Sequence, residues 1–233
     1  MVRQQPEQQA PPVQRLRLQY TKRGRARFLS SRDFGRAFER ALRRARVPMA
    51  YSSGFTPHPR ISYANAAPTS AASEAEFLEI GLSERCDPEK VRIALDDALP
   101  EGLDIVRVAE ARGDSLAEQL SASEWLVDLG PTDSGVLAAA IADLLARDGA
   151  DTTRMTKSGP RTFNVRGAIE SISVVGPGEV TLVLHHLVPL VRPDDVVAVL
   201  RHLRPELASD RPVLMTRRRQ GRLVDGRIEH PFD

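Results

Sequence analysis

The alternation of apolar and polar residues predicts a strand and then a helix near the start of the chain. After Gln14, the residues Leu16, Leu18 and Tyr20 alternate with polar ones, which is the period of a half-buried strand. From Phe34 to Ala45 the apolar residues recur three, four and seven positions apart, as on one face of a helix. Ser30 or Ser31 can cap the start of this helix, and Pro48 is expected to end it.

The same kinds of pattern predict further strands and a helix up to Ala109. They predict strands at residues 61–64, 75–82 and 103–109, and a helix that Asp87 caps, that begins at Pro88 and that stops at Gly102. The first half therefore reads as strand, helix, strand, strand, helix, strand.

The second half repeats this order with additional strands. Expected strands lie at 124–129, 152–156, 163–174, 180–186 and 212–217, and expected helices at 137–145 and 194–203. We therefore predict an α+β fold of two tandem ferredoxin-like (split βαβ) modules with antiparallel sheets. The modules are placed at 13–110 and 123–224 around a linker at 111–122, with a disordered N-terminus at 1–12 and a disordered tail at 225–233.

Composition narrows the class of protein. The chain has 233 residues, of which 41% are hydrophobic and 27% charged, as in ordinary soluble proteins. It has no apolar run of about 18 residues and no signal peptide in its Gln- and Pro-rich first dozen residues, so we expect a cytoplasmic location and no membrane partner. Because Cys86 is the only cysteine, we expect no disulfide, no cysteine-based metal site and no cofactor.

Charge is segregated along the chain. Residues 13–46 hold twelve basic and two acidic side chains, whereas residues 61–130 hold fifteen acidic and five basic ones. Two further basic clusters lie at 154–166 and 211–222. Clusters of this kind are typical of proteins that bind a polyanion, although arginines can also simply solvate a surface.

Ten basic residues are the predicted contacts to nucleic acid. Four of them have helical spacing on the side away from the Phe34/Phe38 stripe, and the expected strands offer few rings beyond Tyr63 and Phe77, so binding should be to the phosphate backbone. The ten residues are Arg36, Arg40, Arg43, Arg44, Arg60, Lys157, Arg161, Arg166, Arg217 and Arg218.

One loop is chemically unusual. Two prolines flank His58 and restrict the backbone on both sides of it, so that His58 is a candidate catalytic residue for proton transfer. The loop serves equally well as a plain rigid connection. Its characteristic residues are Gly54, Phe55, Pro57, His58 and Pro59.

These motifs resemble a known family. The segments 28–45, 54–62 and 74–80, with Thr156–Arg161 and Asn164–Arg166 further on, are similar to the bacterial radical-SAM-associated family of unknown function. Its members occur alone or as the C-terminal extension of a cobalamin-binding-type radical SAM protein. The family commonly has histidine at the position of Ser31 and aspartate at that of Asn164. This chain cannot itself hold the radical SAM cluster, which takes three cysteines. The family name implies an association with a radical SAM enzyme, and the resemblance then implies that this enzyme is a separate protein or is absent.

Three functions remain open from the sequence. The leading hypothesis is an accessory protein that binds structured RNA or ribonucleoprotein and presents it to a modifying or processing enzyme. The second is an RNA-cleaving enzyme that resembles the metal-independent CRISPR-repeat endoribonucleases, with His58 as general acid or base and Lys157 or Arg161 stabilising the phosphorane. The third is a subunit whose acidic surface docks a basic protein.

Overall fold

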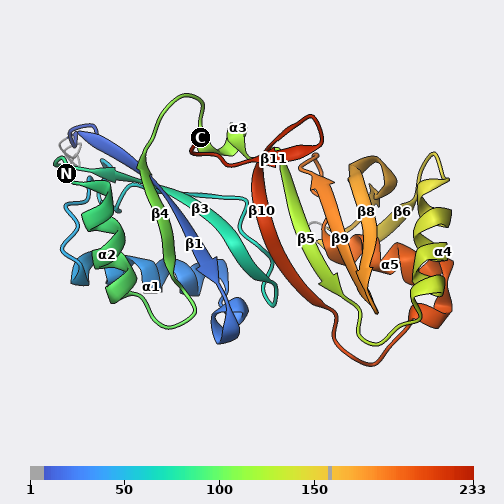
Figure 1. The fold of residues 1–233 in the computed structure, drawn as a ribbon. Coiled ribbons are helices and arrows are strands. Elements are labelled where there is room, and N and C mark those ends of the chain that lie inside the picture. Colours follow the sequence, from blue (N-terminus) through green and yellow to red (C-terminus); the bar gives the residue numbers. More distant parts are fainter. Residues whose placement is uncertain (1–7, 157–158) are drawn as a thin grey trace. The chain divides into compact units, whose positions relative to one another are not determined.

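The computed structural model describes residues 8–156 and 159–233, and the chain divides into two compact units. Unit 1 comprises the chain up to Gln119 together with Phe232 and Asp233, and unit 2 comprises Leu120–Pro231. Both units are mixed α+β, with antiparallel pairing between their strands (Figure 1).

Unit 1 contains four paired strands. Its elements are β1 (Gln14–Lys22), η1 (Gly24–Phe28), α1 (Ser31–Arg44), β2 (Ile61–Ala64), β3 (Ala72–Leu82), α2 (Pro88–Ala98), β4 (Ile105–Glu110) and α3 (Leu116–Gln119). Strand β1 pairs with β4 and β3, and β2 pairs with β3, which gives the strand order β4-β1-β3-β2. The element order from β1 to β4 is the one predicted from the sequence.

The core of unit 1 lies between this sheet and its two long helices. Leu16 and Leu18 of β1 pack with Phe38 of α1, and Leu78 of β3 and Leu95 of α2 belong to the same cluster. All five side chains are fully buried. The alternate residues of β1, β2 and β3 therefore lie on the opposite side of the sheet, which we call the open face.

The ends of the helices follow from local chemistry. Ser30 Oγ accepts a hydrogen bond from the Asp33 amide at 3.2 Å, and Asp87 Oδ1 accepts one from the Glu89 amide at 2.8 Å. Both caps were predicted. Helix α1 ends at Arg44, before Pro48, because the chain turns at Arg46, whose φ is +54°. The proline is therefore not what ends this helix.

Unit 2 has the same strand order with an added hairpin. Its elements are β5 (Ala122–Asp128), α4 (Ser134–Leu145), β6 (Asp151–Thr156), β7 (Gly159–Asn164), η2 (Arg166–Ala168), β8 (Ile169–Gly176), β9 (Glu179–His185), α5 (Pro193–Leu203), η3 (Pro205–Leu207), β10 (Leu214–Val224) and β11 (Arg227–Glu229). The main strands have the order β10-β5-β9-β8, and β6 and β7 pair only with each other. Buried apolar residues such as Val127, Leu144, Leu182 and Leu200 form its core.

Two sequence predictions differ from the structure. The single strand expected at 163–174 is two strands, β7 and β8, separated by a turn in which Asn164 Oδ1 accepts from the Gly167 amide at 3.2 Å. The tail expected to be disordered at 225–233 contains β11, which pairs with β10, and its penultimate residue, Phe232, packs against Phe77 in unit 1. Of the N-terminus expected to be disordered, residues 1–7 lie outside the described residues, while the Gln9 amide donates to Ser53 Oγ at 2.9 Å.

Candidate nucleic-acid interface and the groove of unit 1

Helix α1 carries four of the predicted nucleic-acid contacts on one surface. Its apolar side is buried against the sheet, and its other side presents basic residues that are all exposed. We call these residues, Arg36, Arg40, Arg43 and Arg44, the α1 arginine face. Since an α-helix rises about 1.5 Å per residue, the face extends about 12 Å along the helix axis.

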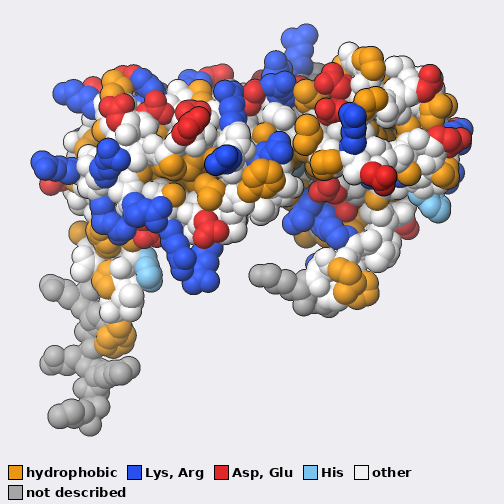
Figure 2. Space-filling model, turned by 90° about the horizontal axis from the view of Figure 1, so that it is seen from below, with side chains coloured by type: hydrophobic (Ala, Val, Ile, Leu, Met, Phe, Trp, Pro, Cys, Tyr) orange, Lys and Arg blue, Asp and Glu red, His pale blue; other side chains and the backbone are white. Residues whose placement is uncertain are grey.

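No carboxylate neutralises this face within the described part of the chain. None of its four arginines forms an ion pair or a hydrogen bond there. The acids of the helix are Asp33, which accepts from the Ser30 hydroxyl at 2.6 Å, and Glu39. Burial, followed by the charge of Glu39, raises the pKa of Tyr63 to about 12. Figure 2 looks onto the side where α1 lies and shows Lys and Arg side chains gathered over this part of unit 1.

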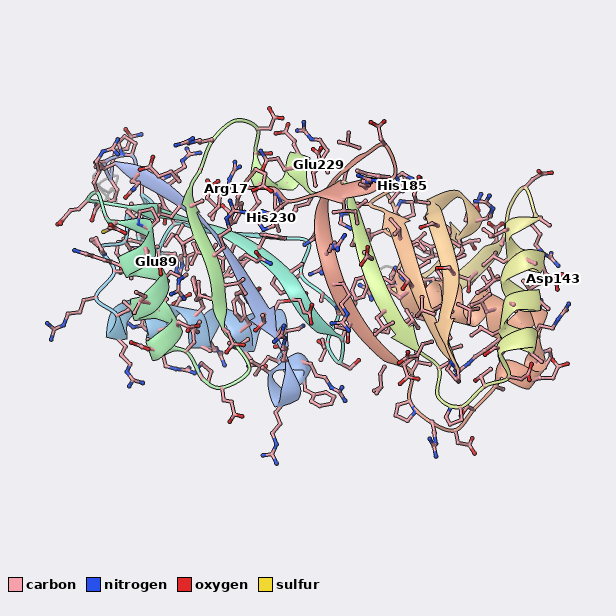
Figure 3. All side chains as sticks on the ribbon, viewed as in Figure 1. Arg17, Glu89, Asp143, His185, Glu229 and His230 are labelled. Atoms are coloured by element: carbon pink, nitrogen blue, oxygen red, sulfur yellow. The ribbon has the colours of Figure 1, made fainter. Side chains whose placement is uncertain are left out.

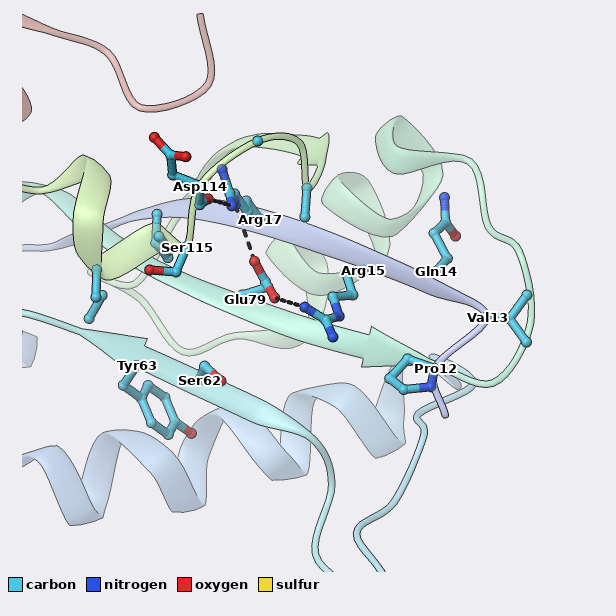
Figure 4. A pocket seen from close by; sticks show the side chains of 15 residues that line it. Pro12, Val13, Gln14, Arg15, Arg17, Ser62, Tyr63, Glu79, Asp114 and Ser115 are labelled. Atoms are coloured by element: carbon cyan, nitrogen blue, oxygen red, sulfur yellow. Dashed lines mark hydrogen bonds and ion pairs between the residues drawn. The ribbon is translucent and has the colours of Figure 1, made fainter. Parts of the chain in front are cut away.

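A pocket of about 640 Å³ lies on the open face of unit 1 (Figure 4). Its floor includes Arg15 and Arg17 of β1, Glu79 of β3 and Ser62 of β2, and residues 111–117 form one wall. The Tyr63 side chain points away from the pocket towards α1. The volume is within the range of about 300–1,000 Å³ that small-molecule sites occupy.

Arg17 holds the wall of this pocket in place. Only 4% of the residue is exposed, and its Nε donates to Glu79 Oε2 at 3.1 Å. Its Nη groups donate to the carbonyl of Arg112 at 2.9 Å and to the carbonyl of Asp114. One buried guanidinium thus links the sheet to the segment that follows β4, and Figure 4 shows its contacts with Glu79 and Asp114.

Arg15 is bound far less tightly than Arg17. Its side chain is 65% exposed, and its Nη1 lies 3.7 Å from Glu79 Oε1. A guanidinium carries five N–H donors, so the Arg15 side chain, which lines the pocket, retains donors beyond its contact with Glu79. Arg15, Arg17 and Glu79 were not predicted as site residues from the sequence. The feature that could have indicated them is the pair of arginines, Arg15 and Arg17, on the polar side of the first predicted strand.

A second pocket of about 390 Å³ continues the first one. It shares Pro12, Arg15, Ser62 and Glu79 with the larger pocket and adds His58 and Arg60 to the lining. Because four residues line both pockets, we treat them as one feature, the unit 1 groove. The structure therefore brings two predicted functional residues, His58 and Arg60, to the same groove as Arg15.

The strand register places Arg15 and Arg60 on either side of Gly81 at the groove. Arg15 is the β-partner of Gly81, and the Gly81 amide donates to the Arg60 carbonyl at 2.9 Å. A Cβ added at Gly81 would lie 2.9 Å from Pro12 Cγ and 3.3 Å from Arg60 Cβ, so the glycine leaves room for the proline ring between the two arginines. With strands about 4.8 Å apart, the two arginine backbones lie about 10 Å apart, within reach of a common ligand.

The loop that carries His58 is closed by its own backbone. The His58 amide donates to Ser52 Oγ at 3.0 Å, and the Ser52 amide donates to the His58 carbonyl at 2.9 Å. Tyr51 and Pro59 form an isolated antiparallel bridge at the base of the loop. His58 is exposed, and Phe55 near the tip is 69% exposed. The loop therefore presents the imidazole at the groove on an ordered backbone.

The predicted contacts in unit 2 differ in exposure. Arg161 of β7 and Arg218 of β10 are exposed. Arg166 is half-buried and donates to the carbonyl of Leu145 at 3.3 Å, at the C-terminal end of α4. Lys157 lies outside the described residues. Among the predicted contacts of unit 2 that the structure describes, Arg161 and Arg218 are therefore the ones with exposed side chains.

Arg217 requires a correction. Only 2% of it is exposed, its guanidinium lies 5.3 Å from the centre of the Trp125 ring, and its Nη1 donates to Gln220 Oε1 at 3.1 Å. The alternation of β10 places Arg217 inward and Arg218 outward. Its burial removes Arg217 from the surface proposed to meet nucleic acid.

A buried polar chain in unit 2 involves the second residue of the His185-His186 pair. Trp125 Nε1 donates to Ser123 Oγ at 2.8 Å, Ser123 Oγ lies 3.0 Å from His186 Nε2, and His186 Nδ1 lies 2.7 Å from the Leu120 carbonyl. Since a carbonyl only accepts, the proton is on Nδ1, and Nε2 accepts from the serine. Burial lowers the pKa of His186 to about 4. This chain keeps the ring neutral and is structural.

Neither a metal centre nor a membrane helix is found in the part of the chain that the structure describes. No group of three or more His, Cys, Asp and Glu side chains there is arranged to hold a metal ion. No helix there is both long and apolar enough to cross a membrane. His185, labelled in Figure 3, pairs instead with Glu170 at 2.8 Å.

The chain is thus an α+β protein with an exposed arginine face on one helix and a polar groove on a sheet. Residues 15–196, well over half of the chain, match the family described as "Uncharacterized protein conserved in bacteria (DUF2344)", and the chain belongs to this family. No curated protein matches it. The matched range contains both the α1 arginine face and the His58 loop.

Proposed function

We propose that the protein binds structured RNA or ribonucleoprotein through the α1 arginine face and presents it to a modifying or processing enzyme in the cytoplasm. The proposal is carried by the four exposed arginines along one side of α1, none of which is paired with an acid in the described structure. A nucleic-acid duplex carries closely spaced phosphates, about one charge per 1.7 Å of axis, so a row about 12 Å long spans several of them. Arg161 and Arg218 are candidates for additional contacts.

The proposal also covers the fold of each unit and the enzyme that would receive the RNA. We infer that each unit is a ferredoxin-like module, which the strand orders β4-β1-β3-β2 and β10-β5-β9-β8 support. The enzyme that receives the RNA is proposed to be a radical SAM protein encoded separately, as the resemblance of the sequence motifs implies. Cys86 alone cannot ligate such a cluster.

Purification from native cells, with and without nuclease, tests this proposal. We expect a defined RNA to be enriched with the wild-type protein and lost with Arg40→Ala/Arg43→Ala/Arg44→Ala. A matched variant, Arg147→Ala/Arg211→Ala/Arg227→Ala, removes the same charge from exposed positions of unit 2 and should retain the RNA. Recovery of a protein partner that survives nuclease, without enriched RNA, would replace RNA binding with protein docking.

The groove favours cleavage of RNA as a second candidate function. His58, Arg15 and Arg60 line the same pocket, so an imidazole and two arginines are available to a phosphate bound there. In this reaction His58 would take the proton of a ribose 2′-hydroxyl, the oxygen would attack phosphorus, and the 5′-oxygen would leave with a proton from water. Loss of cleavage in His58→Ala at unchanged RNA affinity would support this function. Absence of cleavage by the wild type on the RNA it enriches would remove it.

A further inference from the structure

We infer that the unit 1 groove binds the phosphate group of a nucleotide, with the nucleoside in the larger pocket. This rests on the proposed function, because it names what the groove would take from an RNA partner. The ligand chemistry is a nucleotide phosphate, and its source is either an RNA terminus or a free mononucleotide.

The charges in the groove favour a phosphate at its narrower end. Arg15 and Arg60 flank Gly81 in one row of the sheet, and His58 lines the same pocket of about 390 Å³. The carboxylate at this end, Glu79, is already bound by the buried Arg17 at 3.1 Å, so its charge is offset. Arg15, Arg60 and His58 therefore line a pocket whose carboxylate, Glu79, is already paired. The Nε of Arg60 donates to the Tyr51 carbonyl at 3.1 Å, and the guanidinium has further donors on its Nη groups, which suits an anion with several acceptor oxygens.

The larger pocket has the composition that a nucleoside requires. Val13, Ala64 and Ala117 give it an apolar wall, and the hydroxyls of Ser62 and Ser115 offer partners for ribose or base. Its volume of about 640 Å³ is suited to a ligand of nucleoside size. Because Ser62 and Arg15 line both pockets, a ligand can extend from the apolar wall to the arginine pair without leaving the groove.

Gly81 and Pro12, which lie beside Arg15 and Arg60, fit a ligand site at this place. With a side chain at position 81, the Pro12 ring would be displaced from between the arginines, since a Cβ there would lie 3.1 Å from Pro12 Cβ as well. Pro12 lines both pockets and packs over Gly81, so its ring closes this side of the groove with an apolar surface. The groove is thereby shaped by residues that leave the guanidinium groups as its main donors.

Calorimetric titration of the full-length protein with uridine 5′-monophosphate and with uridine tests the inference. We expect the monophosphate to bind at least about tenfold more tightly than uridine, because only it reaches the arginine pair. Arg15→Ala/Arg60→Ala should weaken monophosphate binding at least about tenfold, whereas Arg85→Ala/Lys90→Ala, which removes the same charge from exposed positions of unit 1, should leave it unchanged. Equal binding of the two ligands, no binding of either, or equal losses in the two variants would overturn the inference.

Two further arms separate the possible outcomes. Competition by an RNA with a 5′-phosphate, but not by the same RNA with a 5′-hydroxyl, would identify an RNA terminus as the source, and no competition by either RNA would identify the mononucleotide. The α1 variant Arg40→Ala/Arg43→Ala/Arg44→Ala should keep its affinity for the monophosphate. If that variant loses RNA but the wild type binds no monophosphate, the groove inference fails and the proposed function stands. If the wild type binds the monophosphate but no RNA, the groove inference stands and the proposed RNA-binding function fails.

Discussion

Arg17 Nε and Glu79 Oε2 are 3.1 Å apart on the open face of unit 1, and their side chains are only 5% and 16% exposed. The same guanidinium also donates to two backbone carbonyls of the segment after β4. A buried cation with this many partners is costly to remove, because each partner would be left in a poorly solvated place. Arg17 therefore connects the sheet to the wall of the groove, and it also offsets the charge of Glu79.

We predict that Arg17→Ala lowers the free energy of unfolding by about 3 kcal/mol, as expected when one partner of a buried ion pair is lost. Arg15→Ala removes an exposed partner of the same carboxylate and should cost less than about 1 kcal/mol. Urea unfolding measures both changes. Trypsin cleavage after Arg112 should also accelerate in Arg17→Ala, because the segment loses its attachment. A loss in Arg15→Ala as large as that in Arg17→Ala would contradict this account.

The half-buried ring of His186, which is hydrogen-bonded to Leu120 and Ser123, predicts a pH dependence of stability. Its pKa falls from 6.5 to about 4 on folding, so between these values the unfolded chain binds a proton that the folded chain does not. The contribution is therefore fully present above about pH 6.5 and is lost as the pH falls towards 4, by up to about 1.4 kcal/mol per pH unit. Unfolding of His186→Gln across this range should show a shallower loss than the wild type.

His202→Gln serves as the control for that measurement, since His202 is an exposed histidine of the same unit. It should keep the steep dependence of the wild type. Equal slopes in the wild type and in His186→Gln would show that the ring of His186 does not remain neutral in the folded state.

The C-terminal Phe232 is predicted to stabilise unit 1. Its ring meets Phe77 edge-on at 5.5 Å and lies 5.6 Å from the Arg107 guanidinium. Phe232→Ala should lower the free energy of unfolding by about 2 kcal/mol, roughly half the loss for a fully buried phenylalanine. Asp233→Ala removes only the exposed pair with Arg107 and should cost less than about 1 kcal/mol. If the two variants are equally stable in thermal unfolding, the packing of Phe232 contributes nothing.

Elements with strong local signals were predicted well from the sequence. The start of α2 is one example: Asp87 accepts from the Glu89 and Lys90 amides, and Pro88 occupies the first helical position. The short strand β2 was predicted with its observed bounds, 61–64. These signals depend on neighbouring residues alone, so no knowledge of tertiary contacts was needed.

The groove could not be predicted in the same way, because it depends on register and on distant segments. Nothing local indicates that Arg60 lies beside Gly81 and across from Arg15, or that Arg17 would reach the carbonyl of Arg112. Arg217 was wrongly predicted to contact nucleic acid, because in the sequence it belongs to a basic cluster. Its inward orientation, beside Trp125, depends on how β10 pairs in the sheet.

The salt dependence of RNA binding tests the central claim most directly. Filter binding of the RNA enriched from native cells, between about 50 and 200 mM salt, gives the slope of log affinity against log salt concentration. If the α1 arginine face contacts phosphates, the Arg40→Ala/Arg43→Ala/Arg44→Ala variant should have a slope smaller in magnitude by about 2 to 3, since each lost contact contributes about 0.7 to 0.9. The Arg147→Ala/Arg211→Ala/Arg227→Ala control should keep the wild-type slope. The same slope in all three proteins would contradict phosphate binding by α1.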